Sequence, residues 1–151
     1  MAMKHTLALS AIALLLSACG GAASDAPKGE ISKTRTAAFK TMMPEFADMG
    51  KMVKGDEAFD EAKFQKLAAV FAENAQEPFK HFQNDPQGNG DALPAVWEKP
   101  AEFEAAQNRF LQAVDTLNST AQTAKLNDLK AAHGEVGASC KACHDSFRRP
   151  K

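Results

Sequence analysis

Gly134-Glu-Val-Gly-Ala-Ser-Cys-Lys-Ala-Cys-His-Asp-Ser-Phe-Arg148 is the most informative stretch of this 151-residue sequence, because it contains the pattern Cys140-x-x-Cys143-His144. This pattern is typical of covalent haem attachment, in which two thiols bond to two haem vinyl groups and the next residue offers an imidazole to the iron. On an α-helix, Cys143 lies about 60° to one side of Cys140 and His144 about 40° to the other. The three side chains therefore face one way, and the sequence predicts one covalent haem c with His144 as an axial iron ligand.

Two other uses of the cysteine pair fit the sequence less well. A redox pair usually opens a helix in a βαβ setting, and the sequence has no such setting. A zinc site would need further ligands, and only His5, His81 and His133 remain as histidines. His133 lies about 16 Å before His144 along a helix, so it cannot reach the same iron. We expect His133 to fill a core position and His81 to lie at the surface or at a helix end.

Apolar residues recur at intervals of three and four in four stretches of the chain, which predicts four amphipathic helices. They cover residues 31–53, residues 60–82, a segment that begins at Pro100, and residues 125–149. Pro44 predicts a bend in the first helix and not its end, because the apolar pattern continues in phase. Residues 84–97 hold two Pro and two Gly and predict a loop, longer than a bundle needs, with a packing or functional role.

The sequence has no strand-like alternation of useful length and no internal repeat. Four helices, each with one apolar face, are most simply buried against one another. The predicted fold is therefore all-α: an antiparallel, up-down-up-down four-helix bundle with haem c attached on the C-terminal helix.

Residues 1–18 have the shape of a lipoprotein signal peptide, with Lys4 near the start and a largely apolar run at positions 7–16 that is too short to span a membrane. Leu16-Ser17-Ala18-Cys19 matches the lipobox of bacterial lipoproteins, in which the cysteine is acylated and becomes the new N-terminus. The alternative is an ordinary cleavage site beside an accidental cysteine. Residues 19–29 then form an acylated flexible tether, and residues 30–151 form the bundle.

The expected location is the periplasm, with an anchor in the membrane through lipidated Cys19. Gly20, and not Asp, follows this cysteine, which in Gram-negative lipoproteins usually permits sorting to the outer membrane. With Cys19 used by lipid and Cys140 and Cys143 by haem, no disulfide is expected. The net charge is −1, and without a basic stripe the sequence gives no case for a nucleic-acid partner.

Three segments resemble the class II cytochromes c, the cytochrome c′ family. The final stretch quoted above looks very like the last helix of that family, where the haem attachment site lies near the C-terminus. Asp91-Ala-Leu-Pro-Ala-Val-Trp97 resembles the loop before the third helix, and Arg35-x-x-x-Phe39 resembles the first helix. The resemblance covers roughly residues 30–150.

The resemblance implies that the residue four positions after Arg35 faces the haem opposite His144. Methionine there gives a six-coordinate electron carrier of the cytochrome c-556 kind, whereas Leu, Phe or Tyr leaves the iron five-coordinate and open to small gases. Phe39 stands at this position and cannot ligate iron. The expected ligands are therefore nitric oxide and carbon monoxide. An apolar lid gives no polar help in cleaving a peroxide, so we expect a gas-binding, redox-capable protein and not an enzyme.

The alternative function is that of a low-spin electron-transfer cytochrome with Met42, one turn beyond Phe39, as the sixth iron ligand. Either function leaves the redox partner of the protein unidentified.

The resemblance also assigns roles to Arg35 and Arg148. Arg35 is expected to neutralise a haem propionate. Arg148 either flanks the proximal imidazole or is a solvated residue that suits the negative helix C-terminus. Relatives are commonly homodimers through their first two helices, and Met43 and Met52 are candidates for such an interface.

Overall fold

The computed structural model describes residues 26–123 and 125–150. It contains the helices α1 (Glu30–Lys54), α2 (Glu61–Asn74), α3 (Ala95–Glu98), α4 (Pro100–Ala121) and α5 (Leu126–Phe147), and a 3₁₀-helix η1 (Glu77–His81). The predicted signal peptide, Cys19 and most of the predicted tether lie outside the described residues. Within the described part of the chain, no helix is both long and apolar enough to cross a membrane.

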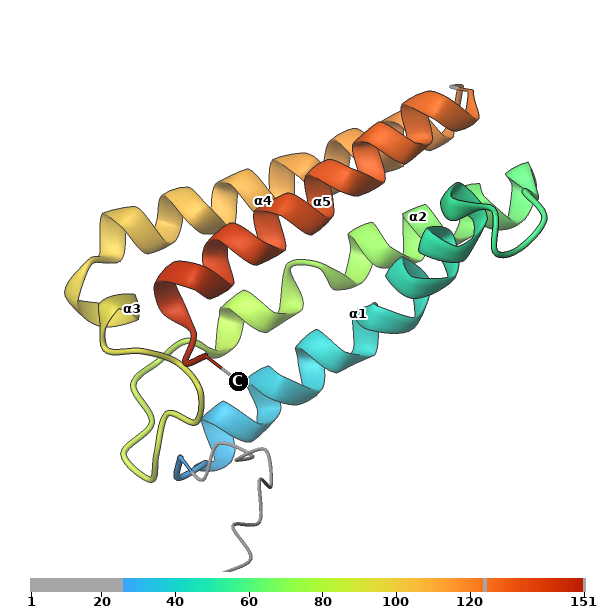
Figure 1. Cartoon of the computed structure of the whole chain (residues 1–151). Helices are drawn as coiled ribbons and strands as arrows, with labels where there is room; N and C mark the ends of the chain where they lie inside the picture. Colours follow the sequence, from blue (N-terminus) through green and yellow to red (C-terminus); the bar gives the residue numbers. More distant parts are fainter. Residues whose placement is uncertain (1–25, 124, 151) are drawn as a thin grey trace, which may run out of the picture.

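The four long helices α1, α2, α4 and α5 form an antiparallel bundle, and each runs opposite to the one before it (Figure 1). The main contacts join α1 to α2, α2 to α4, α4 to α5, and α5 back to α1. The predicted up-down-up-down four-helix bundle is confirmed. Helix α1 also continues through Pro44, as the phase of its apolar residues predicts.

The core lies along the axis of the bundle and receives large side chains from every long helix. Met42, Met49 and Met52 of α1 are 3%, 0% and 1% exposed, because residues three or four apart share one face of a helix. The suggestion that Met52 lies on a dimer interface is therefore wrong: this side chain is in the core. Met43 is 47% exposed.

Polar residues and a glycine set the start of α2 and both ends of α1. The Oδ1 atom of Asp60 accepts a hydrogen bond from the backbone N–H of Lys63 and caps α2. Gly55 ends α1 with φ +84°, a left-handed conformation that favours glycine. The N-terminus of α1 has a cap from elsewhere in the chain, since Asp85 accepts a hydrogen bond from the N–H of Ser32 at 2.9 Å.

The second predicted helix, over residues 60–82, is too long. Helix α2 ends at Asn74, and a 3₁₀-helix follows from Glu77 to His81. The physical reason is Pro78, which has no N–H to donate to the carbonyl of Asn74 and whose ring clashes with that carbonyl in an α-helix. The predicted loop at 84–97 is also incomplete, because its last residues form the short helix α3.

His133 lies between helices α5 and α1, half-buried, as expected for a core position. Its ring stacks on Phe46 at a centroid distance of 4.0 Å, and its Nε2 atom lies 3.0 Å from the backbone oxygen of Phe46. Burial lowers the pKa of His133; the hydrogen bond to Phe46 opposes this shift, and the charge of Lys54 adds to it.

The lowered pKa of His133 predicts that the stability of the folded protein depends on pH, which tests whether His133 is buried in the bundle. As the pH falls, the unfolded chain takes up a proton at His133, at about pH 6.5, before the folded protein does. The stability that neutral His133 contributes is therefore present above that pH and is lost below it. We expect His133→Phe to flatten the dependence of the urea midpoint on pH between about pH 5 and 7. An unchanged slope in His133→Phe would contradict the assignment.

Candidate functional site

The last turns of α5 place the predicted haem-attachment residues together. Cys140 and Cys143 are half-buried free thiols, and His144, the next residue, is exposed. Burial is the main cause that raises the pKa of Cys140 to about 11, with a smaller contribution from Cys143. Burial also raises the pKa of Cys143. Both sulfur atoms are therefore protonated thiols at neutral pH.

A cluster of phenylalanine rings connects α5 with α1 at this end of the bundle. Phe147 contacts Phe103 of α4 at a centroid distance of 5.3 Å, and Phe103 contacts Phe82 at 4.7 Å. Phe82 in turn lies 6.3 Å from Phe39 of α1, which also meets Phe79 edge-on at 5.8 Å. These five residues are called the phenylalanine cluster below. The cluster links the predicted distal residue, Phe39, to the helix that carries His144.

Sequence reasoning missed two members of this cluster, Phe79 and Phe82. The sequence predicts both residues in the last turns of one continuous second helix and gives neither of them a role. The available signal is the pair itself: Phe79 directly follows Pro78 in the 3₁₀-helix, and Phe82, three residues later, is the residue at which that helix ends, so the spacing places both rings on one side.

Arg35 is a buried cation, 5% exposed, on the same face of α1 as Phe39. Its Nη1 donates to the backbone oxygen of His81 at 2.9 Å and its Nη2 to that of Asn89 at 2.6 Å. The guanidinium carbon lies 4.7 Å from the centre of the Phe82 ring, close enough for a cation–π contact. Burial lowers the pKa of Arg35, while the charges of Asp85 and Asp91 act in the opposite direction.

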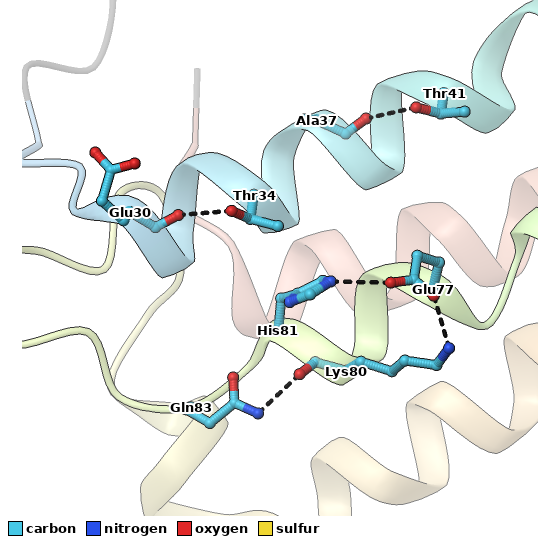
Figure 2. A network of polar contacts seen from close by, with 8 residues as sticks. All are labelled: Glu30, Thr34, Ala37, Thr41, Glu77, Lys80, His81 and Gln83. Atoms are coloured by element: carbon cyan, nitrogen blue, oxygen red, sulfur yellow. Dashed lines mark hydrogen bonds and ion pairs between the residues drawn. The ribbon is translucent and has the colours of Figure 1, made fainter.

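His81, the last residue of the 3₁₀-helix η1, contacts Arg35 through its backbone carbonyl and Glu77 through its side chain. Figure 2 shows the His81 ring turned toward Glu77, with its Nε2 atom 3.1 Å from Oε1 of that residue. Lys80 contacts the other carboxylate oxygen of Glu77 at 2.7 Å. His81 therefore lies at a helix end, as predicted, and its backbone oxygen serves the buried cation.

Arg148 follows the last residue of α5 and lies beside the predicted iron ligand. Its N–H donates to the carbonyl of His144 at 3.1 Å, and the two residues line the same surface hollow. Its Nη2 atom lies 3.7 Å from Oδ2 of Asp91, a partly exposed ion pair. The structure thus brings Arg148 and His144 together, and it gives Arg148 a carboxylate partner that the sequence did not suggest.

The residues at this end of the bundle fit a haem c. The two half-buried thiols and the imidazole come from two consecutive helical turns, and the phenylalanine cluster offers apolar surface for a macrocycle. Arg35 is a buried cation whose present partners are neutral carbonyls, and it is suited to an anionic propionate. Cys140 and Cys143 would hold the group, and His144 would ligate the iron.

Fold and site together define a class: a c-type haem protein built as a four-helix bundle, with its attachment motif on the last helix. The family described as Cytochrome C′ matches residues 30–148. The chain belongs to the cytochrome c′ family, and it is accordingly a haem c protein with one covalently attached haem.

Individual relatives agree with this assignment. Cytochrome c′ from Alcaligenes xylosoxydans xylosoxydans is 36% identical over 119 residues, which cover 79% of this chain and 93% of the relative. Cytochrome c′ from Rubrivivax gelatinosus is 34% identical, covering 80% of this chain and 95% of the relative. A more distant relative, cytochrome c-556 from Rhodopseudomonas palustris, is 27% identical over 66% of this chain and 70% of its own length.

Solved structures show the same architecture. A nitric oxide complex of a cytochrome c prime variant from Alcaligenes xylosoxidans superposes with a TM-score of 0.76 at 34% identity, covering 81% of this chain and 95% of that chain. A carbon monoxide-bound variant of the same protein gives a TM-score of 0.75 at 34% identity, covering 80% of this chain and 95% of that chain.

Proposed function

We propose that the haem iron of this protein is five-coordinate and binds small gases, nitric oxide above all, on the face opposite His144. The observation that carries this proposal is Phe39. Its ring packs edge-on against Phe79 and Phe82, four residues after the buried Arg35, and phenylalanine offers no atom that can ligate iron. Nitric oxide and carbon monoxide need little polarity on the distal side, so an apolar ring there is compatible with both.

The solved relatives support this ligand class. Two of them are variants of one bacterial cytochrome c prime bound to nitric oxide and to carbon monoxide. Binding of either gas, together with one-electron redox chemistry at the iron, suits a protein that tolerates or shuttles nitric oxide.

Met42 is the residue on which the second candidate function depends. This side chain is 3% exposed and belongs to the central core of the bundle, among residues that pack against one another. As an iron ligand it would have to leave that core, which costs about 2–5 kcal/mol for a buried methionine side chain. The weaker similarity to a cytochrome c-556 is what keeps an electron-transfer function as the alternative.

Absorption spectra of the purified holoprotein separate the two functions. We expect a high-spin ferric spectrum and a ferrous form that binds carbon monoxide at once, because one axial position is open. A far-red methionine–iron band, with no binding of carbon monoxide, would overturn the proposal in favour of Met42.

We also propose that the mature protein is a periplasmic lipoprotein, anchored through acylated Cys19, in the outer membrane. The support is the lipobox at residues 16–19 and the following Gly20. Cys19→Ser is expected to move the haem protein from the membrane pellet to the soluble fraction, because acylation needs the thiol. Immunoblots of both fractions measure this. A variant that is still pelleted with membranes counts against the anchor.

A further inference from the structure

The start of the described chain is fixed to the loop that precedes α3. The N–H of Gly29 donates to the carbonyl of Gly88 at 2.9 Å, and the N–H of Gly90 donates to the carbonyl of Pro27 at 2.8 Å. Gly88 and Gly90 have φ of +130° and +59°, and a side chain at Gly88 would collide with the backbone of Pro27. The point at which the N-terminal segment leaves the bundle is therefore held in place by backbone contacts.

The same loop is fixed to the end of the helix that carries the haem-attachment residues. The N–H of Leu93 donates to the carbonyl of Phe147 at 2.9 Å, and the N–H of Arg149 donates to the carbonyl of Asp91 at 2.8 Å. The start of α1 and the end of α5 consequently lie at one end of the bundle (Figure 1). We call the surface formed by residues 26–29, 85–93 and 147–150 the haem end, and the turn at residues 55–60 the far end.

The length of the N-terminal segment limits how an anchored bundle can stand on a membrane. Seven peptide units separate Cys19 from Ala26, the first described residue, and they span at most about 25 Å. Helix α1 has 25 residues and separates the two ends of the bundle by about 37 Å. An upright bundle with its far end on the bilayer would place Ala26 farther from the membrane than the segment can reach.

Charge distinguishes the two ends as well. The haem end contains three basic and two acidic residues: Arg148 faces Asp91, and the buried Asp85 caps α1. Lys28 and Arg149 are exposed cations with no ion pair among the described residues. The far end, residues 55–60, contains three acidic residues and no basic one. An anionic lipid surface attracts basic segments by about 1 kcal/mol for each Lys or Arg close to it, so the haem end is favoured at such a surface over the far end.

We propose that the anchored protein stands with its haem end against the lipid headgroups, with Lys28 and Arg149 near the phosphates of an anionic bilayer. This inference rests on the lipid anchor proposed above. In this orientation the bilayer contacts the bundle itself and does not only hold the acyl chains of Cys19. Gases dissolved in the membrane and redox proteins embedded in it then meet the haem side of the molecule first.

Spin labels on the two ends test the orientation in the lipidated holoprotein. With Cys19 acylated and the other two cysteines bonded to haem, a thiol introduced as Gln87→Cys or Asp56→Cys is the single free one; both positions are exposed. Each labelled protein is placed in vesicles of phosphatidylethanolamine and phosphatidylglycerol that carry a nickel-chelating lipid. The enhancement of spin relaxation by the nickel measures proximity to the headgroups.

We expect a several-fold larger relaxation enhancement at position 87 than at position 56, and a smaller difference after Lys28→Glu with Arg149→Glu or in purely zwitterionic vesicles. Equal enhancements, or a larger one at position 56, would overturn the orientation while leaving the anchor intact. A difference that appears in native membranes but not in these vesicles would assign the contact to a membrane protein and also overturn the proposal. If the lipidated protein does not bind vesicles at all, the anchor itself fails, and the orientation with it.

Discussion

Phe39→Met is expected to convert the haem iron from five-coordinate and high-spin to six-coordinate and low-spin, and to suppress binding of carbon monoxide by the ferrous protein. The substitution puts a thioether where the phenylalanine ring now meets Phe79 and Phe82. Methionine sulfur is an established axial ligand of haem c, and methionine fills a phenylalanine site with little loss of packing.

The size of the effect follows from competition between an internal and an external ligand. If the methionine-ligated state is favoured by about 3 kcal/mol, the apparent affinity for carbon monoxide falls about 100-fold. Titration of the ferrous protein with carbon monoxide and the ferric absorption spectrum measure the two consequences separately.

Phe39→Leu is the matched control, because it also changes the ring but provides no atom that can ligate iron. We expect it to stay high-spin and to bind carbon monoxide. A Phe39→Met protein with the spectrum and affinity of the wild type would show that Phe39 is not on the distal face, and the proposed gas site would then have to be abandoned.

Arg35→Met is expected to destabilise the folded protein by roughly 2–4 kcal/mol. The change leaves the carbonyls of His81 and Asn89 without their donor, at about 1–3 kcal/mol for each buried acceptor, and removes the cation–π contact with Phe82. Part of this loss is offset, because the variant no longer buries a cation. Urea unfolding of the ferric holoprotein should show a lower midpoint with an unchanged slope.

The expected contact between Arg35 and a haem propionate is tested separately, by the reduction potential of the haem. Loss of a positive charge beside the haem disfavours the added electron, so the reduction potential of Arg35→Met should fall. Arg35→Lys keeps the charge and should lower stability with a smaller change in potential. Lys66→Met is the matched surface control, because Lys66 of α2 is exposed and such substitutions usually stay within about 0.5 kcal/mol. Stability loss without any change in potential would limit Arg35 to a structural role.

The parts of the fold that the sequence predicts well are those with local causes. The start of α2 at Asp60, the end of α1 at Gly55 and the start of α4 at Pro100 each depend on the conformation or hydrogen bonding of one residue and its near neighbours. The end of α2 at Asn74 also has a local cause, Pro78, but the apolar pattern continues past it and predicts a longer helix. The wrong placement of Met52 has a different origin, because only the packing of the neighbouring helices decides which apolar residues of α1 are covered.

The haem-attachment pattern of Cys140, Cys143 and His144 was determined by the sequence alone, since helical geometry fixes how three residues within five positions face. The sequence also marked Arg35 and Phe39, through resemblance. Only the tertiary structure decided what surrounds them: Arg35 bonds to carbonyls 46 and 54 residues away, and Phe39 meets rings of η1 and of the segment that follows it. The physical reason is that these contacts depend on the path of a long loop and on how helices pack, which no local pattern of residues encodes. The same loop joins the start of α1 to the end of α5, and so decides which end of the bundle an N-terminal anchor would hold to a membrane.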